Sequence, residues 1–226
     1  MANSDVSRRW LTFPMMAFFL IEGFQKTTHI KKYLGRLFIF AVVSQIPYFW
    51  ANNYTPWFFP LNVMFLLFLG LLMVHLHEKI QIRWLFWVLF IIFMLISLTM
   101  EWGFIGIIAI LMYKIIKNEN KRRFWPPFTL AFINISFGFL ALGFVALLRT
   151  LAASPEFADL AELGLEGFSF QMASLLIFFG IGHLLAGFLL KRYNNQRGKS
   201  MKYLFYVIYP LHFAILGLIA HLLNIR

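Results

Sequence analysis

Eight apolar segments, separated by polar or charged turns, divide the chain along its length. A helix that spans a bilayer needs about 20 mostly apolar residues, and most of these segments approach that length. They cover residues 10–24, 33–51, 57–76, 83–100, 103–116, 124–148, 168–190 and 203–224. The first and fifth are short, and residues 83–116 can also be read as one helix broken around Glu101–Gly103, which gives seven spans. The pattern predicts an all-α, polytopic membrane helix bundle of about eight transmembrane helices.

The turns between these segments alternate in charge. Four turns are rich in Lys and Arg, at residues 25–36, 77–83, 114–123 and 191–202, and the turns between them are uncharged or mainly acidic. Because Lys and Arg collect in cytoplasmic loops, the alternation favours eight spans with the basic loops in the cytoplasm and both termini outside. Arg8 and Arg9 in the N-terminal tail conflict with an outside N-terminus, and one more helix upstream would remove the conflict.

Composition supports a membrane protein and excludes several other classes. The chain has 226 residues, of which 61% are hydrophobic and 13% charged, whereas about a quarter of a soluble domain is charged. The net charge of +11 lies in the loops, so it reports topology and does not predict nucleic-acid binding. The chain has no cysteine, which excludes disulfides and thiolate metal sites.

We therefore expect a single integral membrane domain over residues 1–226. A short N-terminal tail is expected over 1–9, and an outer acidic loop over 149–167. That loop is either solvated or a short amphipathic helix at the membrane surface.

A carboxylate near the inner end of the first segment is the first candidate functional group. Glu22 lies in an apolar segment, where an ionisable residue is expensive and is read as functional with a partner to be named. Arg36, expected in the first turn of the next helix, is the predicted partner. Alternatively, Glu22 pairs with Lys26 one helical turn on, or extends to the membrane surface.

Further polar groups are expected at several depths of the bundle. Gln45 lies beyond the middle of the second segment, Asn62 in the outer part of the third, and Glu101 closes the fourth at the outer face. His212 follows Tyr209-Pro210-Leu211 about 14 Å along the last segment, near the bilayer middle. A neutral imidazole there could transfer protons, or it could simply pack against a neighbouring helix.

No metal site is predicted. His75 and His77 are two residues apart and point to different sides of a helix, whereas zinc-binding helices use a spacing of three or four. His183 lies among small residues and is read as a packed histidine.

Several stretches resemble the TraX family, which is named for the conjugative-pilus protein that acetylates pilin. The stretch FPMMAFFLIEGFQKTTHIKKYLGRLFIFAVVSQIPY resembles the family's signature, and the likeness continues at Leu61-Asn62-Val63, at Glu101-Trp102-Gly103 and at Tyr209-Pro210-Leu211-His212. It covers nearly the whole chain in the right order. The resemblance implies a multi-pass protein of the bacterial plasma membrane that uses acetyl-CoA to acetylate an amine, such as a pilin N-terminus, or another acceptor.

Carried over by position, the resemblance marks Glu22, Gly23, Lys32, Tyr33, Arg36, Asn62, Tyr209 and His212. Together with the positions and charges of the polar residues, it suggests roles for several of them. His212, Glu22 and Tyr209 are the expected catalytic residues. Lys31, Lys32 and Arg36 form an inner basic mouth that could hold the phosphates of coenzyme A. The expected acceptor-binding residues are Gln45, Asn62 and Glu101.

The sequence departs from the family pattern in three places. Gln45 stands where the family more often has an acid, and Glu101-Trp102 where Asp-Tyr is usual. Family members usually begin with one more helix that ends in an Asp-His pair, and Met1 falls just after the point where it would end. The acetyltransferase reading therefore stands beside two others, a catalytically inactive membrane scaffold and a transporter or flippase.

Overall fold

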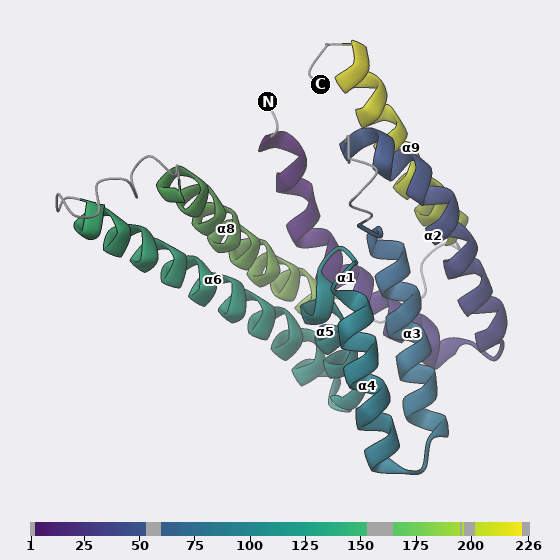
Figure 1. The fold of residues 1–226 in the computed structure, drawn as a ribbon. Coiled ribbons are helices and arrows are strands. Elements are labelled where there is room, and N and C mark those ends of the chain that lie inside the picture. The colour runs from purple at the N-terminus through teal and green to yellow at the C-terminus, as the bar shows by residue number, and fades with distance from the viewer. Residues whose placement is uncertain (1–2, 53–59, 153–164, 195, 197–201, 223–226) are drawn as a thin grey trace. The chain divides into compact units, whose positions relative to one another are not determined.

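The computed structural model describes residues 3–52, 60–152, 165–194, 196 and 202–222 (Figure 1). Within these ranges the chain is all-α, and each helix lies close to a predicted segment. The helices are α1 (Asn3–Lys26), α2 (Ile30–Asn52), α3 (Val63–Lys79), α4 (Arg83–Ser97), α5 (Gly103–Ile115), α6 (Glu119–Ala152), α8 (Leu165–Lys191) and α9 (Lys202–Leu222). The predicted fold class is confirmed.

The helices have the length and surface of membrane helices. Three stretches are long and apolar enough to cross a bilayer, namely Ile30–Asn52, Glu119–Leu151 and Phe170–Lys191. Large apolar side chains are exposed along them, including Ile46 at 76% and Leu140 at 68%. Exposed apolar surface on this scale is typical of a protein that meets lipid, so the chain is a membrane protein.

The boundaries of several helices differ from prediction. α1 begins at Asn3, so the part of the expected 1–9 tail that the structure describes is helical. α3 begins at Val63 and not at residue 57, because Asn62 caps its N-terminus. Of the expected outer loop at 149–167, residues 153–164 lie outside the described ranges, while α6 continues to Ala152 and α8 begins at Leu165.

The alternative of one broken helix over residues 83–116 is wrong. α4 ends at Ser97, and α5 begins at Gly103. Between them the chain turns through Trp102, whose φ of 71° lies in the left-handed region, and Gly103 follows at 48°. Left-handed backbone cannot continue a right-handed helix, so α4 and α5 are separate helices.

The chain divides into two compact units. The first comprises Met1–Phe18 and Ile116–Tyr193, and the second comprises Phe19–Ile115 and Asn194–Arg226. α1 contributes its first part to one unit and its last two turns to the other. The single domain expected over residues 1–226 stays a prediction.

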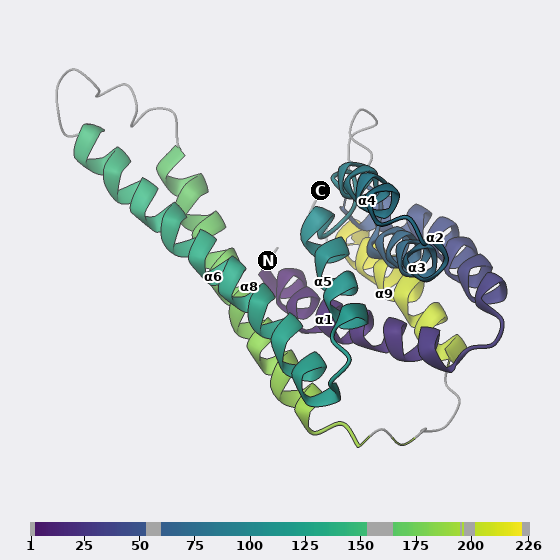
Figure 2. The same cartoon turned by 90° about the horizontal axis from the view of Figure 1, so that it is seen from below.

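In the first unit, α6 and α8 form an antiparallel pair that packs closely through glycines. Both views show the two helices side by side (Figures 1 and 2). A Cβ built at Gly138 would lie 3.1 Å from the carbonyl oxygen of Ala173, and one at Gly180 would lie 3.0 Å from that of Ala131. Small residues let membrane helices approach through their backbones, so these glycines bring α6 and α8 together.

This packing predicts opposite effects for two glycine substitutions. Gly180→Ala places a methyl group against Ile135 and the Ala131 carbonyl, so it should destabilise the protein by about 1–3 kcal/mol. Gly143→Ala meets no atom within 4 Å and should stabilise α6 by about 0.5–1 kcal/mol. Thermal unfolding in detergent measures both. An equal change in the two variants would contradict the close packing at Gly180.

In the second unit, α3 is the central helix. It packs against α2, α4 and α5, and Leu66, Leu71 and Met73 are fully buried. A Cβ at Gly70 would clash with Ile110 of α5, so glycine is needed for this approach. α9 packs along α2 (Figure 1), and these two helices carry most of the predicted site residues.

Candidate functional site

The ends of α1, α3 and α5, which lead into basic turns, meet at one end of the second unit. Lys114, near the end of α5, pairs with Glu78 near the end of α3. The Lys114 ammonium also lies 4.7 Å from the ring centre of Phe24, near the end of α1. We call this the basic end of the second unit. The charge alternation predicted that these turns share a side, and the structure brings them together.

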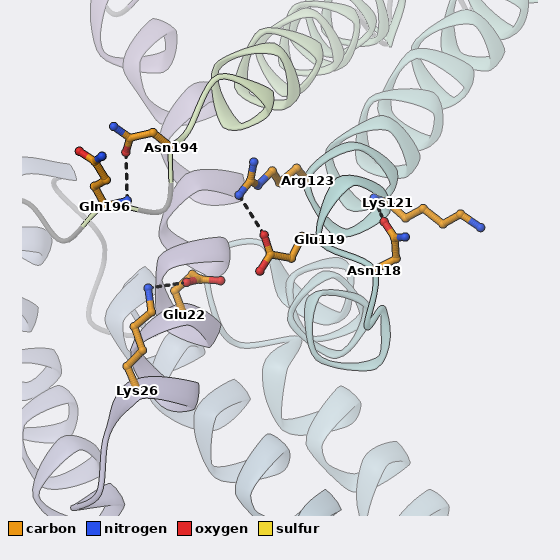
Figure 3. Close-up of polar contacts among 8 residues, drawn as sticks. All are labelled: Glu22, Lys26, Asn118, Glu119, Lys121, Arg123, Asn194 and Gln196. Carbon is orange, nitrogen blue, oxygen red and sulfur yellow. Dashed lines mark hydrogen bonds and ion pairs between the residues drawn. The ribbon is translucent and has the colours of Figure 1, made fainter.

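Glu22 lies at this end and pairs with Lys26. Its carboxylate is 2.9 Å from Lys26 Nζ on the next turn of α1 (Figure 3), and its side chain is only 10% exposed. Residues four apart share a helix face, so the pair forms within α1. The prediction that Glu22 pairs with Arg36 is therefore wrong, and the alternative partner within the helix is the one present.

Arg36 nevertheless lies beside the end of α1. Its guanidinium is 6.0 Å from the ring centre of Tyr33, one turn earlier on α2. A Cβ at Gly23 would lie 3.0 Å from the Tyr33 hydroxyl, so glycine lets α1 pack on Tyr33. Gly23, Tyr33 and Arg36 are thus close together where the end of α1 packs on the start of α2.

The guanidinium of Arg36 has a hydrogen-bond donor left for a ligand. Its Nε is buried and has no hydrogen-bond partner, although a buried donor normally has one. Lys31 and Lys32, on the first turn of the same helix, are exposed. The start of α2 therefore carries three cations, as predicted, and the chemistry of this group suits a phosphate.

α2 and α9 run parallel, and their register places His212 relative to Arg36. The ring of Phe40 stacks on Tyr206 at 4.5 Å between centroids, and Tyr48 meets Phe213 edge-on at 5.2 Å. Later residues of α2 thus meet later residues of α9. Arg36 is one turn before Phe40, and His212 directly precedes Phe213. At 1.5 Å per residue, they are about 15 Å apart along the helix axes.

One local contact of His212 fits a single tautomer of the neutral ring. Its Nδ1 lies 3.2 Å from the carbonyl oxygen of Ile208 on the preceding turn. A carbonyl can only accept, so this contact is a hydrogen bond in the tautomer whose Nδ1 carries the hydrogen and whose Nε2 has the lone pair. The Tyr209 ring packs on the imidazole at 5.3 Å between centroids. His212 can therefore act as a base through Nε2.

The other end of the second unit carries the three predicted acceptor residues. Gln45 Oε1 accepts from the backbone N–H of Asn62 at 3.1 Å and from its Nδ2 at 2.8 Å, and Gln45 Nε2 donates to the carbonyl of Pro60 at 2.9 Å. Asn62 Nδ2 also donates to the carbonyl of Ala41 at 2.9 Å. These bonds join the second half of α2 to the start of α3.

Glu101 is tied to the same segment by backbone. Its N–H donates to the Leu61 carbonyl at 2.9 Å, and the Leu61 N–H donates to the Thr99 carbonyl at 2.8 Å. The structure thus groups Gln45, Asn62 and Glu101 at one end. Glu22, Lys31, Lys32 and Arg36 gather at the basic end. By the register of α2 with α9, Tyr209 and His212 are level with residues 43–47 of α2, beside Gln45.

Two buried arginines in the first unit were not predicted as site residues. Arg122 and Arg123, near the start of α6, are only 5% and 9% exposed. Arg122 lies 5.7 Å from the ring centre of Phe18, and Arg123 lies 5.7 Å from that of Tyr193. Arg123 also pairs with Glu119 at 3.3 Å (Figure 3). Both belong to the basic 114–123 turn, whose charges were interpreted only as a topology signal, and their place at the start of an apolar segment was the available sign of burial.

Two histidines outside α9, His183 and His77, are packed against the rest of the protein. His183 is fully buried, and the ring of His77 packs edge-on against Phe86 at 4.8 Å. Among the residues that the structure describes, no group of three or more His, Cys, Asp or Glu side chains could hold a metal ion.

Comparisons with known proteins agree with the predicted family. The family model described as "TraX protein" matches residues 8–220. The chain is also 28% identical over 221 residues to the "Probable fimbrial assembly protein FimC, serogroup H1" of Dichelobacter nodosus, and the match covers 91% of this chain and 78% of that protein. No solved structure matches. Since the family model spans almost the whole chain, including every predicted site residue, the chain belongs to the TraX family.

Proposed function

We propose that this protein transfers the acetyl group of acetyl-CoA to an amine of a fimbrial or pilus subunit. The observation that carries the proposal is the juxtaposition on α2 and α9. Three cations, among them an arginine whose Nε is buried and unpaired, lie at the start of one helix, and His212 lies on its parallel neighbour with its Nδ1 3.2 Å from the Ile208 carbonyl oxygen. The fimbrial assembly relative supports a fimbrial or pilus subunit as acceptor.

The residues at the basic end fit the donor substrate. Coenzyme A carries its phosphates at one end and its thioester at the end of a long flexible arm. Lys31, Lys32 and Arg36 would bind the phosphates by charge-assisted hydrogen bonds. The distance of about 15 Å along the helices from Arg36 to His212 lets an extended arm bring the thioester to the histidine.

The transfer needs one base and no further reactant. The acceptor nitrogen attacks the thioester carbonyl carbon, the carbon–sulfur bond breaks, and an amide bond forms. His212 Nε2 takes the proton that the amine loses and returns it to the departing thiolate. Tyr209 packs on the imidazole and positions it, while the pair of Glu22 with Lys26 orders the end of α1 beside Tyr33.

The charge distribution supports an orientation in the membrane. The basic ends of α1, α3 and α5 meet on one side of the second unit, and Lys and Arg favour the cytoplasmic side. We place the donor end in the cytoplasm of a bacterium, where acetyl-CoA is made, and the Glu101 end on the outer side of the plasma membrane, where the acceptor arrives.

The test is acetyl transfer by the purified protein in lipid nanodiscs. Isotope-labelled acetyl-CoA is mixed with a short peptide that has a free N-terminal amine, and mass spectrometry follows the peptide. The proposal predicts a labelled acetyl group on the amine that requires the protein. An N-terminally blocked peptide is the matched control. If the unsubstituted protein labels neither the free nor the blocked peptide, the proposed function is wrong.

A further inference from the structure

The segment that leads into α3 is non-helical and is fully bonded on both sides. Pro60–Asn62 pairs with the α4–α5 turn through the two backbone hydrogen bonds of Leu61. Irregular backbone is tolerated at membrane depth only where its polar groups are satisfied within the protein. On the other side, Gln45 Nε2 donates to the Pro60 carbonyl and Gln45 Oε1 accepts from the backbone N–H of Asn62.

The amide of Asn62 has little capacity left for a ligand. An asparagine amide has two donor hydrogens, and both are used, one by Gln45 Oε1 and one by the Ala41 carbonyl. Its Oδ1 accepts from the backbone N–H of Met64 at 2.9 Å, which caps α3. Asn62 is also 0% exposed. An acceptor could bond this amide only by breaking bonds that hold α2 and α3 together.

The turn on the other side of Leu61 contains strained backbone. Trp102 directly follows Glu101 and has a φ of 71°, a conformation that side chains other than glycine rarely adopt. Such strain persists only where surrounding contacts hold it. The hydrogen bonds of Leu61 with Thr99 and Glu101 are contacts of this kind, and they depend on Gln45 and Asn62 keeping Pro60–Asn62 in place.

We propose that Gln45 and Asn62 are positioning residues and not acceptor ligands. They form a clasp, defined as the four side-chain hydrogen bonds that join Gln45, Asn62, Ala41 and Pro60. The clasp fixes Leu61, and Leu61 fixes the turn that carries Glu101. If the protein has the proposed function, the clasp also sets the affinity for the acceptor amine at the Glu101 end. This consequence rests on the proposed function.

Hydrogen exchange tests the clasp without any assay of activity. Gln45→Met removes the amide and keeps an unbranched side chain of similar length. The matched control is Ile46→Met, because Ile46 is the next residue on α2 and is 76% exposed. In Gln45→Met, the amides of Leu61 and Glu101 should exchange about tenfold faster or more, whereas Ile46→Met should leave them unchanged. Amides in the middle of α3 report whether the variant is folded.

Kinetics then separates positioning from direct binding. Gln45→Met should raise the KM for the peptide amine about tenfold and change the KM for acetyl-CoA less than twofold. Unchanged exchange at Leu61 and Glu101 would overturn the clasp, whatever the activity. A raised KM for the amine with unchanged exchange would show that Gln45 binds the acceptor directly. Absence of transfer by the unsubstituted protein would instead contradict the proposed function, and the exchange result would still stand.

Discussion

Replacing His212 with alanine should lower the rate of acetyl transfer by about 10²–10⁴-fold, the usual contribution of a general base. The Nδ1 of the imidazole lies 3.2 Å from the Ile208 carbonyl oxygen of its own helix, and in the proposed mechanism Nε2 takes the proton from the amine. Alanine offers no base, so kcat should fall while the KM for acetyl-CoA changes little. Steady-state kinetics with the labelled donor and the free peptide amine measures both constants.

His221→Ala is the matched control for this prediction. His221 is an exposed histidine near the end of the same helix, so its replacement should leave kcat unchanged. Thermal unfolding of both variants shows whether α9 stays packed against α2. Full activity of a folded His212→Ala variant would contradict the role of His212 as the base.

Arg36→Gln should raise the KM for acetyl-CoA about 10- to 100-fold, because a hydrogen bond to a charged group contributes about 1.5–3 kcal/mol. Glutamine is still polar, but it lacks the positive charge and the paired N–H donors of arginine that suit a phosphate. The bond to the phosphate is the same in the ground state and in the transition state, so kcat should change little. A titration of initial rate against acetyl-CoA concentration measures the effect.

Arg83→Gln tests whether the effect of Arg36→Gln on the KM for acetyl-CoA comes from a specific phosphate site or from the general positive charge of the surface. Arg83 is exposed at the start of α4, in one of the basic turns. If it raised the KM as much as Arg36→Gln, long-range attraction of an anionic substrate would explain both results. Loss of the Arg36 effect in high salt would lead to the same conclusion, since exposed charges are screened there.

The helices could be predicted from the sequence because a membrane imposes a simple rule. A spanning helix needs a long apolar run, and turns must contain the charges, so the segment from 33 to 51 closely matches α2 at Ile30–Asn52. The helix starts were harder to predict. α3 begins where Asn62 can cap it, and a cap depends on local hydrogen bonds that hydropathy does not contain.

The partners of the polar residues were less predictable than their positions. Glu22 was predicted to pair with Arg36, yet it pairs with Lys26, because a partner on the same helix face needs no tertiary packing. Gln45 and Asn62 were expected to bind an acceptor, and the structure adds a hydrogen bond between them that the sequence did not predict. Their bond joins residues 17 positions apart in the sequence, and only the packing of α2 against α3 brings them together.

The parallel pairing of α2 with α9 could also not be predicted from the sequence. The stack of Phe40 on Tyr206 joins the beginning and the end of the second unit. Residue spacing gave the depth of His212 within its own helix, but not the helix beside it. That pairing is the feature on which the proposed acetyl transfer depends.

Photochemical mapping of the donor site tests whether α2 and α9 together bind acetyl-CoA. The protein in nanodiscs is irradiated with a photoreactive acetyl-CoA analogue, with and without an excess of acetyl-CoA, and the adducts are located by mass spectrometry. We predict adducts at residues 30–40 of α2 and 206–213 of α9 that acetyl-CoA prevents. Protected adducts confined to α6 and α8, with none on α2 or α9, would contradict the account.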